Sequence, residues 1–532
     1  MSVSARFRTA VLTASLIGVA SAATEPKPIL EYIKETWVTL TRSHKELAAA
    51  AVDPKFKPGA DGKWLVYIPA DENVDRISKQ LTAEMAPGDF AKIRLVPLEQ
   101  KGNSHQDPGL LYLPRPYVVP GGRFNEMYGW DSYFIQVGLL NDHMNDLAKD
   151  MADNFLYEVR EYGKVLNANR TYYLTRSQPP FLTEMVLGTW VKTKDNAWLE
   201  SALPQIEAFY KFWTSEPHLT ADTGLSRYYD LGEGPAPEVV SSERDAQGRT
   251  HYQLIEEYFK THDVTDYDVT QYFNPKRGGV TDLFYKGDRS MRESGFDPSD
   301  RFGPFNLDII HYDPVCLNSL LYLMETQTAA IYGILGKQAE VAKWHDLADK
   351  RAAKINALMW DDGDGLYYDY NFQKKQVRKY PFLTTFYPLW AGFATPQQAA
   401  RVVKNLSKFE REGGLQTSMN ASGDQWDSPF GWAPLEMIAT EGLRRYGYKE
   451  EANRVASKWL TLIEGQYRAH GIIVEKYDVV HNASYVSNEI KFGYRSNEIG
   501  FGWTNASFTS MLKELSPETR EKILTAPAVS GN

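Results

Sequence analysis

Apolar residues recur every three or four positions along nine long segments of this chain, a spacing typical of helices. The segments are 133–160, 181–193, 198–213, 315–335, 338–359, 396–408, 433–446, 449–465 and 504–514. Alternation typical of strands is limited to short pieces such as 64–68 and 471–475, and no strand–helix–strand repeat runs through the chain. The pattern disfavours a TIM barrel or a Rossmann sheet. It predicts an all-α protein whose helices pack in pairs as an α/α toroid.

The toroid is expected to be a single domain with smaller segments around it. We expect residues 23–110 to form an N-terminal extension that packs on the toroid, residues 111–515 to form the toroid, and residues 516–532 to form a polar tail. Within the toroid, the stretch 216–304 is rich in Gly, Pro and charged residues and is expected to be a loop-rich excursion.

The first 22 residues have the pattern of a secretory signal peptide. Arg6 and Arg8 precede an apolar, small-residue run at 10–20, and Ala20-Ser21-Ala22 resembles an A-x-A cleavage site. The run is too short for a stable membrane anchor. The sequence therefore predicts cleavage after Ala22, a periplasmic or secreted protein, and no stable membrane insertion.

Composition and net charge exclude some classes of ligand and favour others. The net charge is −9, which argues against nucleic acid, since phosphate binding needs clustered Lys and Arg. Cys316 is the only cysteine, so a Cys-rich metal site is excluded, and the ten histidines show no ligand spacing. Aromatic residues make up 13% of the chain, which favours a core rich in rings and a partner with C–H faces, such as a sugar.

Two similar segments place a Trp beside an Asp immediately before a helix. They are Pro120–Tyr133, with Trp130-Asp131, and Gln425–Pro434, with Trp426-Asp427. A Trp face and a neighbouring carboxylate can hold a sugar ring, whereas the alternative is a structural loop whose carboxylate caps the following helix. The repetition of the motif favours carbohydrate.

Two further acids stand where a side chain can be held rigidly. Asp297 follows a glycine turn in Arg292–Asp297, and Glu475 follows the apolar run 472–474. Glycosidic hydrolysis needs one carboxyl group to protonate the leaving oxygen and a second to activate water or to attack. Spacing alone does not choose the pair, because four other acids remain candidates: Glu126, Asp131, Asp427 and Glu436.

The two Trp–Asp segments resemble the signature motifs of the trehalases of glycoside hydrolase family 37. Further blocks resemble that family in the same order, so that the resemblance covers roughly 120–505; they are Asn167–Pro180, Arg292–Asp297, Val474–Asp478 and Gly500–Asn505. The chain is similar to the periplasmic or secreted bacterial branch in its predicted export, with a divergent lid loop.

The resemblance implies an (α/α)6 toroid that hydrolyses α,α-trehalose to two glucose molecules with inversion. By position, Asp297 matches the general acid and Glu475 the general base. The positions that match sugar-binding residues are Arg123, Trp130, Asp131, Asn167, Arg176, Ser177, Gln178, Glu238, Arg292 and Gly295. No metal and no organic cofactor is implied, and the protein is expected to act as a monomer on a small disaccharide.

Three departures from the family pattern bear on the substrate. Ala236 stands where the periplasmic branch has an Arg, and Phe296 stands where the family usually has Trp. The segment 481–499 replaces a glycine-rich lid, with Tyr494 at the expected position of the lid glutamate and Glu489 or Glu498 as possible substitutes. A hydrolase of the same fold that acts on another α-glucoside, or a sugar-binding protein without catalysis, remain the alternatives.

Overall fold

The computed structural model describes residues 26–99, 107–240, 244–245, 247–276, 278–486, 490–492 and 496–529. The predicted signal peptide, residues 1–22, and the lid positions Glu489 and Tyr494 lie outside the described residues.

Six helices contact one another in a closed inner ring, in which each helix touches the next and the last touches the first. The inner helices are α5 (Gly129–Asn141), α7 (Leu182–Thr193), α12 (Val315–Ile334), α14 (Tyr387–Ala391), α16 (Ala433–Arg445) and α18 (Gly502–Lys513). Helices α5, α12, α16 and α18 are buried along most of their length, as expected of helices that have neighbours on every side.

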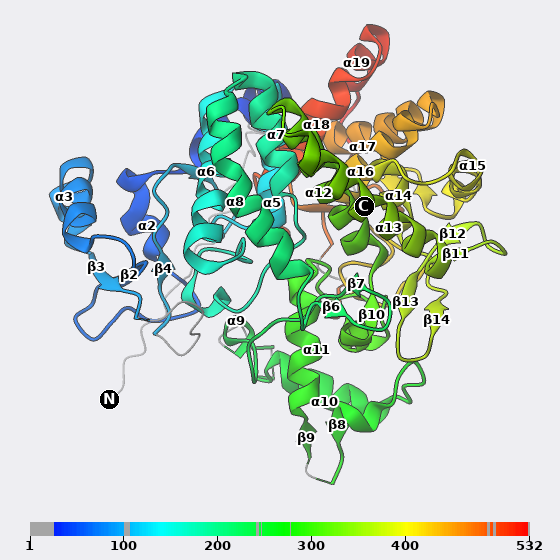
Figure 1. Ribbon diagram of the computed structural model, residues 1–532, viewed down its shortest axis with the longest axis horizontal. Coiled ribbons are helices and arrows are strands. Elements are labelled where there is room, and N and C mark those ends of the chain that lie inside the picture. The colour runs from blue at the N-terminus through cyan, green and yellow to red at the C-terminus, as the bar shows by residue number, and fades with distance from the viewer. Residues whose placement is uncertain are drawn as a thin grey trace, which may run out of the picture.

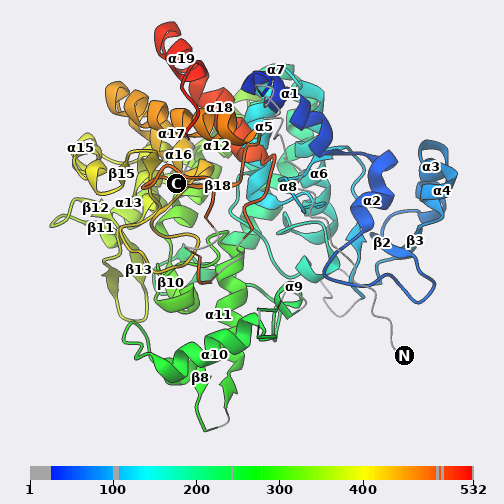
Figure 2. The ribbon, with the colours of Figure 1, turned by 180° about the vertical axis from the view of Figure 1, so that it is seen from behind.

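Further helices lie outside this ring (Figures 1 and 2). They are α1 (Ile29–Leu40), α6 (Asn145–Tyr162), α8 (Asn196–Trp213), α13 (Gln338–Leu358), α15 (Pro396–Lys404) and α17 (Lys449–His470). Helix α1 packs against α18, so a segment far from the toroid in sequence contributes to its outer layer. The prediction of an all-α, (α/α)6 toroid is confirmed.

A small unit stands beside the toroid, drawn in blue in Figure 1. Its three parallel strands have the order β3–β2–β4, and two helices lie between β2 and β3 in the chain. The elements are α2 (Leu47–Ala51), β2 (Trp64–Ile68), α3 (Val74–Glu84), α4 (Pro87–Phe90), β3 (Ile93–Pro97) and β4 (Leu110–Leu111). Strand β2 coincides with the alternation noted at 64–68.

The excursion at 216–304 is more helical than the sequence pattern indicates. It contains α9 (Pro237–Val240), α10 (His251–Thr261) and α11 (Asp282–Glu293), together with the short hairpins β6–β7 (Leu219–Thr220, Leu225–Ser226) and β8–β9 (Phe273–Asn274, Gly279–Val280). The buried face of α11 is polar, including Lys286, Asp288, Arg289 and Glu293. Apolar periodicity therefore could not reveal this helix.

The remaining strands are two or three residues long and link the loops of the toroid. They are β1 (Thr41–Arg42), β5 (Tyr117–Val118), β10 (Tyr312–Asp313), β11 (Trp360–Asp361), β12 (Leu366–Tyr367), β13 (Asp369–Asn371), β14 (Gln376–Arg378), β15 (Glu410–Arg411), β16 (Gly414–Leu415), β17 (Phe430–Trp432) and β18 (Lys476–Asp478). The pair β17–β18 matters for the site because it joins the second Trp–Asp segment to the strand that follows Glu475.

Near the C-terminus, the segment expected to be a polar tail contains α19 (Pro517–Leu524), which packs on α17. Within the described part of the chain, no helix combines the length and apolarity needed to cross a bilayer.

Candidate active site

The second Trp–Asp segment lies against the loop that carries Asp297. The Gln425 side-chain amide donates to the carbonyl of Asp297, and the Trp426 backbone N–H donates to the carbonyl of Pro298 at 3.1 Å. The first segment reaches the same loop through Gly295. Its φ is +78°, and a Cβ at that position would lie 2.8 Å from the Trp130 ring, so glycine allows the loop to lie on the tryptophan.

The tryptophans of the two segments pack on one another. Trp130 is 2% exposed, and its ring centroid lies 5.6 Å from that of Trp426 and 6.0 Å from that of Trp503. Trp426 stacks on Trp432 at 3.9 Å. These rings form one buried aromatic cluster, and burial of large rings accounts for much of the aromatic excess.

The charges of Glu475 and Asp297 both act on Asp131. Burial raises the pKa of Asp131 well above its usual value, and the charges of Glu475 and Asp297 raise it further. Asp297 and Glu475 therefore both lie near Asp131, although the three carboxyl groups come from distant parts of the sequence. Asp131 lies in the first turn of α5, and the N-cap residue of that helix, Tyr128, makes no side-chain cap hydrogen bond.

Asp297 has the environment of a carboxyl group that keeps its proton. Burial raises its pKa to about 7, against the opposing charges of Arg292 and Arg176. The Asp297 side chain is nevertheless 33% exposed, so its carboxyl group is accessible from solvent. Its Oδ2 lies 3.7 Å from Nη1 of Arg292.

The backbone N–H and the backbone carbonyl of Glu475 are both hydrogen-bonded. Its N–H donates to the Glu498 carbonyl at 2.9 Å, and its carbonyl accepts from the Trp503 indole at 3.0 Å. The side chain is 2% exposed, and Nζ of Lys476 lies 3.0 Å from Oε2. The two side chains form a buried ion pair.

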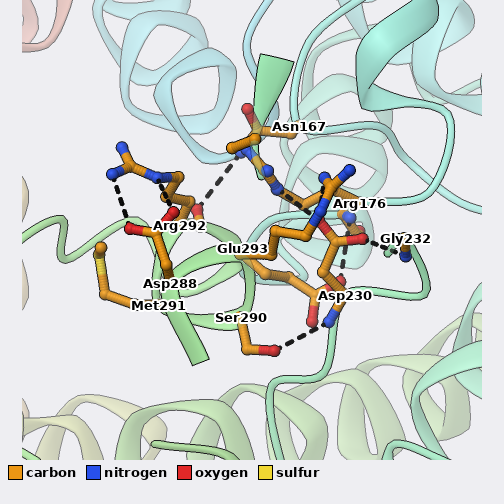
Figure 3. A network of polar contacts seen from close by, with 12 residues as sticks. Asn167, Arg176, Asp230, Gly232, Asp288, Ser290, Met291, Arg292 and Glu293 are labelled. Atoms are coloured by element: carbon orange, nitrogen blue, oxygen red, sulfur yellow. Dashed lines mark hydrogen bonds and ion pairs between the residues drawn. The ribbon is translucent and has the colours of Figure 1, made fainter. Parts of the chain in front are cut away.

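Two arginines reach the site, each already paired with carboxylates (Figure 3). Arg176 donates from Nε to Asp230 at 2.7 Å and from Nη1 to Glu238 at 2.5 Å. Burial alone would raise the pKa of Asp230, but Arg176 and Arg289 hold it at about 2. Nη2 of Arg176 and Oε2 of Glu238 are buried and lack a hydrogen-bond partner, so each can still bind a sugar hydroxyl.

The segment 167–178 contacts Arg292 and Trp130. The Asn167 amide donates to the Arg292 carbonyl at 3.4 Å, and Oε1 of Gln178 accepts from the Trp130 backbone at 2.9 Å. The Ser177 N–H donates to Glu293 at 3.1 Å, and the Ser177 hydroxyl donates to the Val165 carbonyl. These contacts fix the backbone on which Arg176 stands.

Arg123 lies at the lid segment. Its N–H donates to Oε2 of Glu498 at 3.0 Å, and its Nε lies 3.6 Å from Oε1 of the same carboxylate. Glu498 therefore links the first signature segment to the backbone of Glu475, whereas the exposed His481 pairs with Asp478.

Three of the other candidate acids make structural contacts with other groups. Glu126 pairs with the buried Arg170 at 2.7 Å. Asp427 accepts from the Asp300 backbone and from the side chains of Ser418, Ser422 and Tyr380. Glu436 accepts from the Leu415 N–H at 2.5 Å.

Asp230, Asp288, Glu293 and Lys476 were not identified from the sequence. Asp288 had a usable signal, because it stands four residues before Arg292, the spacing of a helical ion pair. Asp230 and Glu293 had none, since their partners are distant in sequence. Among the residues that the structure describes, no group of three or more His, Cys, Asp or Glu is arranged to hold a metal ion.

Comparisons with known proteins agree on one family. The family model described as Trehalase matches residues 29–516. A cytosolic neutral trehalase of Saccharomyces cerevisiae is 37% identical over 488 residues, which cover 85% of this chain and 64% of the yeast protein. One from Emericella nidulans is 37% identical, covering 92% of this chain and 72% of that protein. The chain thus spans just under two thirds of the yeast relative.

A solved structure is similar throughout. The neutral trehalase Nth1 from Saccharomyces cerevisiae has a TM-score of 0.78 and 34% identity, and the match covers 93% of this chain and 96% of that one.

These relatives correct the expected location and branch. Five of the similar proteins are named cytosolic, so the prediction of a periplasmic or secreted protein of the bacterial type is wrong. A short apolar run behind two arginines is a pattern of low information, and it is outweighed by similarity along nearly the whole chain.

Proposed function

Since the chain belongs to the trehalase family, we propose that it hydrolyses α,α-trehalose to two glucose molecules with inversion. The observation that carries the proposal is the pair of unlike carboxyl groups beside Asp131. One, Asp297, has its pKa raised to about 7 and is accessible, and the other, Glu475, lies beside an ammonium group. Unlike environments are what a general acid and a general base require.

In the proposed mechanism, Asp297 protonates the glycosidic oxygen while Glu475 takes a proton from the attacking water. Arg176 and Glu238 offer unpaired buried atoms to the sugar hydroxyls, and Arg292 stands beside the acid. The other proposed sugar-binding residues are Arg123, Trp130, Asp131, Asn167, Ser177, Gln178 and Gly295. Both proton transfers use side chains, and the protein is proposed to act as a monomer.

A panel of disaccharides tests the substrate. Trehalose is expected to have the highest kcat/KM among trehalose, maltose, isomaltose, kojibiose and nigerose. A clear preference for another α-glucoside would keep the fold and the chemistry but overturn the substrate. Binding of trehalose without release of glucose would favour the non-catalytic alternative.

The pH dependence follows from Asp297. A general acid works only while protonated, so kcat/KM is expected to fall above a pH of about 7, where the free enzyme loses the Asp297 proton. Replacing Arg292 with Leu removes a cation that favours the ionised carboxylate. It should move this alkaline limb to higher pH, besides weakening binding. A limb that stays in place or moves down would contradict the assignment of the limb to Asp297.

A further inference from the structure

The positive charge of Arg292 opposes the protonated state that Asp297 needs as a general acid. Its guanidinium group lies 3.7 Å from the Asp297 carboxyl, and a cation at this range favours loss of the proton that the acid must deliver. Arg176 opposes protonation in the same way. Something must therefore limit how much of this positive charge reaches Asp297.

Asp288 is placed to limit the effect of the Arg292 charge on Asp297. It accepts from Nε of Arg292 at 3.2 Å and from Nη2 at 2.9 Å, which is the two-point geometry of a carboxylate on a guanidinium fork (Figure 3). The Asp288 side chain is 2% exposed, so water screens the pair weakly. Asp288 stands one turn before Arg292 on α11 and leaves Nη1 turned to Asp297.

Tyr252 holds Asp288 from a second element. Its hydroxyl donates to Oδ2 of Asp288 at 2.8 Å and accepts from the Ala236 N–H at 3.1 Å. Ala236 is fully buried and leads into α9, where Glu238 holds Arg176. One chain of contacts therefore connects the supports of both arginines.

We propose that Asp288, held by Tyr252, is a positioning residue. It fixes the Arg292 guanidinium group beside Asp297 and partly neutralises the positive charge of that group. This inference rests on the proposed function of Asp297. The charged groups that act on Asp297 are Arg292, Arg176 and Asp288, and Asp131 is a neighbouring carboxyl group whose own pKa is raised by Asp297. Arg292 acts on Asp288, as does the nearby His251, whose own pKa is lowered to about 4 by burial, and the Tyr252 hydroxyl also donates to Asp288.

The sign of the effect is fixed by charge. Asp288 disfavours a second negative charge at Asp297, so removing its charge lets Arg292 act on Asp297 unopposed and lowers the pKa of Asp297. Asp288→Asn is therefore expected to move the alkaline limb of kcat/KM down by about one pH unit. KM should also rise, because the Arg292 fork loses its ionic partner. Tyr252→Phe keeps the Asp288 charge, so its limb should stay in place or rise slightly.

The chain offers a matched control. Asp53 is 2% exposed, accepts from the Tyr172 hydroxyl at 2.8 Å and lies 3.9 Å from Nε of Arg170, so it forms a second buried Tyr–Asp–Arg group in the N-terminal part of the protein. Asp53→Asn is expected to leave the alkaline limb where it is. A limb unmoved by Asp288→Asn, moved equally by Asp53→Asn, or lowered by Tyr252→Phe would overturn the inference.

A second readout separates this inference from the proposed function. Carboxyl 13C NMR of aspartate-labelled protein follows the titration of Asp297 directly, with the signal assigned by its loss in Asp297→Asn. The titration should shift down in Asp288→Asn even if no disaccharide is hydrolysed. Should Asp288→Asn fail to fold, Tyr252→Phe carries the test, with a downward shift of the titration as the contradicting result.

Discussion

Replacing Asp297 with Asn is expected to reduce kcat for trehalose by about 1,000-fold or more. A glucose leaving group needs a proton in the transition state, and an amide cannot supply it. Binding should survive, because the side chain keeps its size and Arg176 and Glu238 are untouched. The matched substrate is α-glucosyl fluoride, whose leaving group needs no proton. Asp297→Asn should retain most activity on it, and equal losses on both substrates would contradict the role of general acid.

The same variant makes a prediction about stability. The folded-state pKa of Asp297 lies above the unfolded value, so stability from its protonated form is present below pH 4 and is lost as the pH rises toward 7. Asp297→Asn should therefore gain thermal stability relative to the parent protein at pH 8, and gain little at pH 4. Thermal unfolding at the two pH values measures this, and a variant that is less stable at pH 8 would argue against a strained acid.

Replacing Glu475 with Gln is expected to cost about 1,000-fold in kcat as well, since the attacking water loses the group that accepts its proton. The backbone contacts to Glu498 and Trp503 do not depend on the carboxylate, so the segment should keep its place. Glu436→Gln alters another buried glutamate of the toroid and serves as the control, with an expected loss of stability rather than of chemistry.

Azide separates loss of the base from general damage to the site. It attacks without giving up a proton, so it should restore turnover in Glu475→Ala and yield β-glucosyl azide. Trehalose consumption that azide does not restore, or a product of the α configuration, would contradict Glu475 as the base of an inverting reaction.

Helices of the toroid could be predicted because their buried faces are apolar. The ends of these helices are harder to predict from the sequence. The segment 133–160 was expected as one helix, but α5 ends at Asn141 and α6 begins at Asn145, with His143 at φ +63° between them. The apolar phase continues across this turn and neither Gly nor Pro marks it, so the only local sign of the break is the Asn and Asp run at 141–146.

The helix that carries much of the site, α11, could not be predicted in this way. Helix α11 carries Asp288, Arg292 and Glu293 on buried or partly buried positions, and a polar buried face has no apolar period to detect. Its polar residues are satisfied by distant partners such as Asn167 and Ser177, which only folding brings close. The family resemblance supplied candidate residues, while the groups that support them came from the structure.

Proton NMR of the purified protein with trehalose, followed from the first minutes, tests the central claim most directly. Inversion at one centre releases one glucose as the β anomer and leaves the other as the α anomer. The account predicts α- and β-glucose in equal amounts before mutarotation. An early excess of α-glucose would mean retention and would contradict the roles given to Asp297 and Glu475.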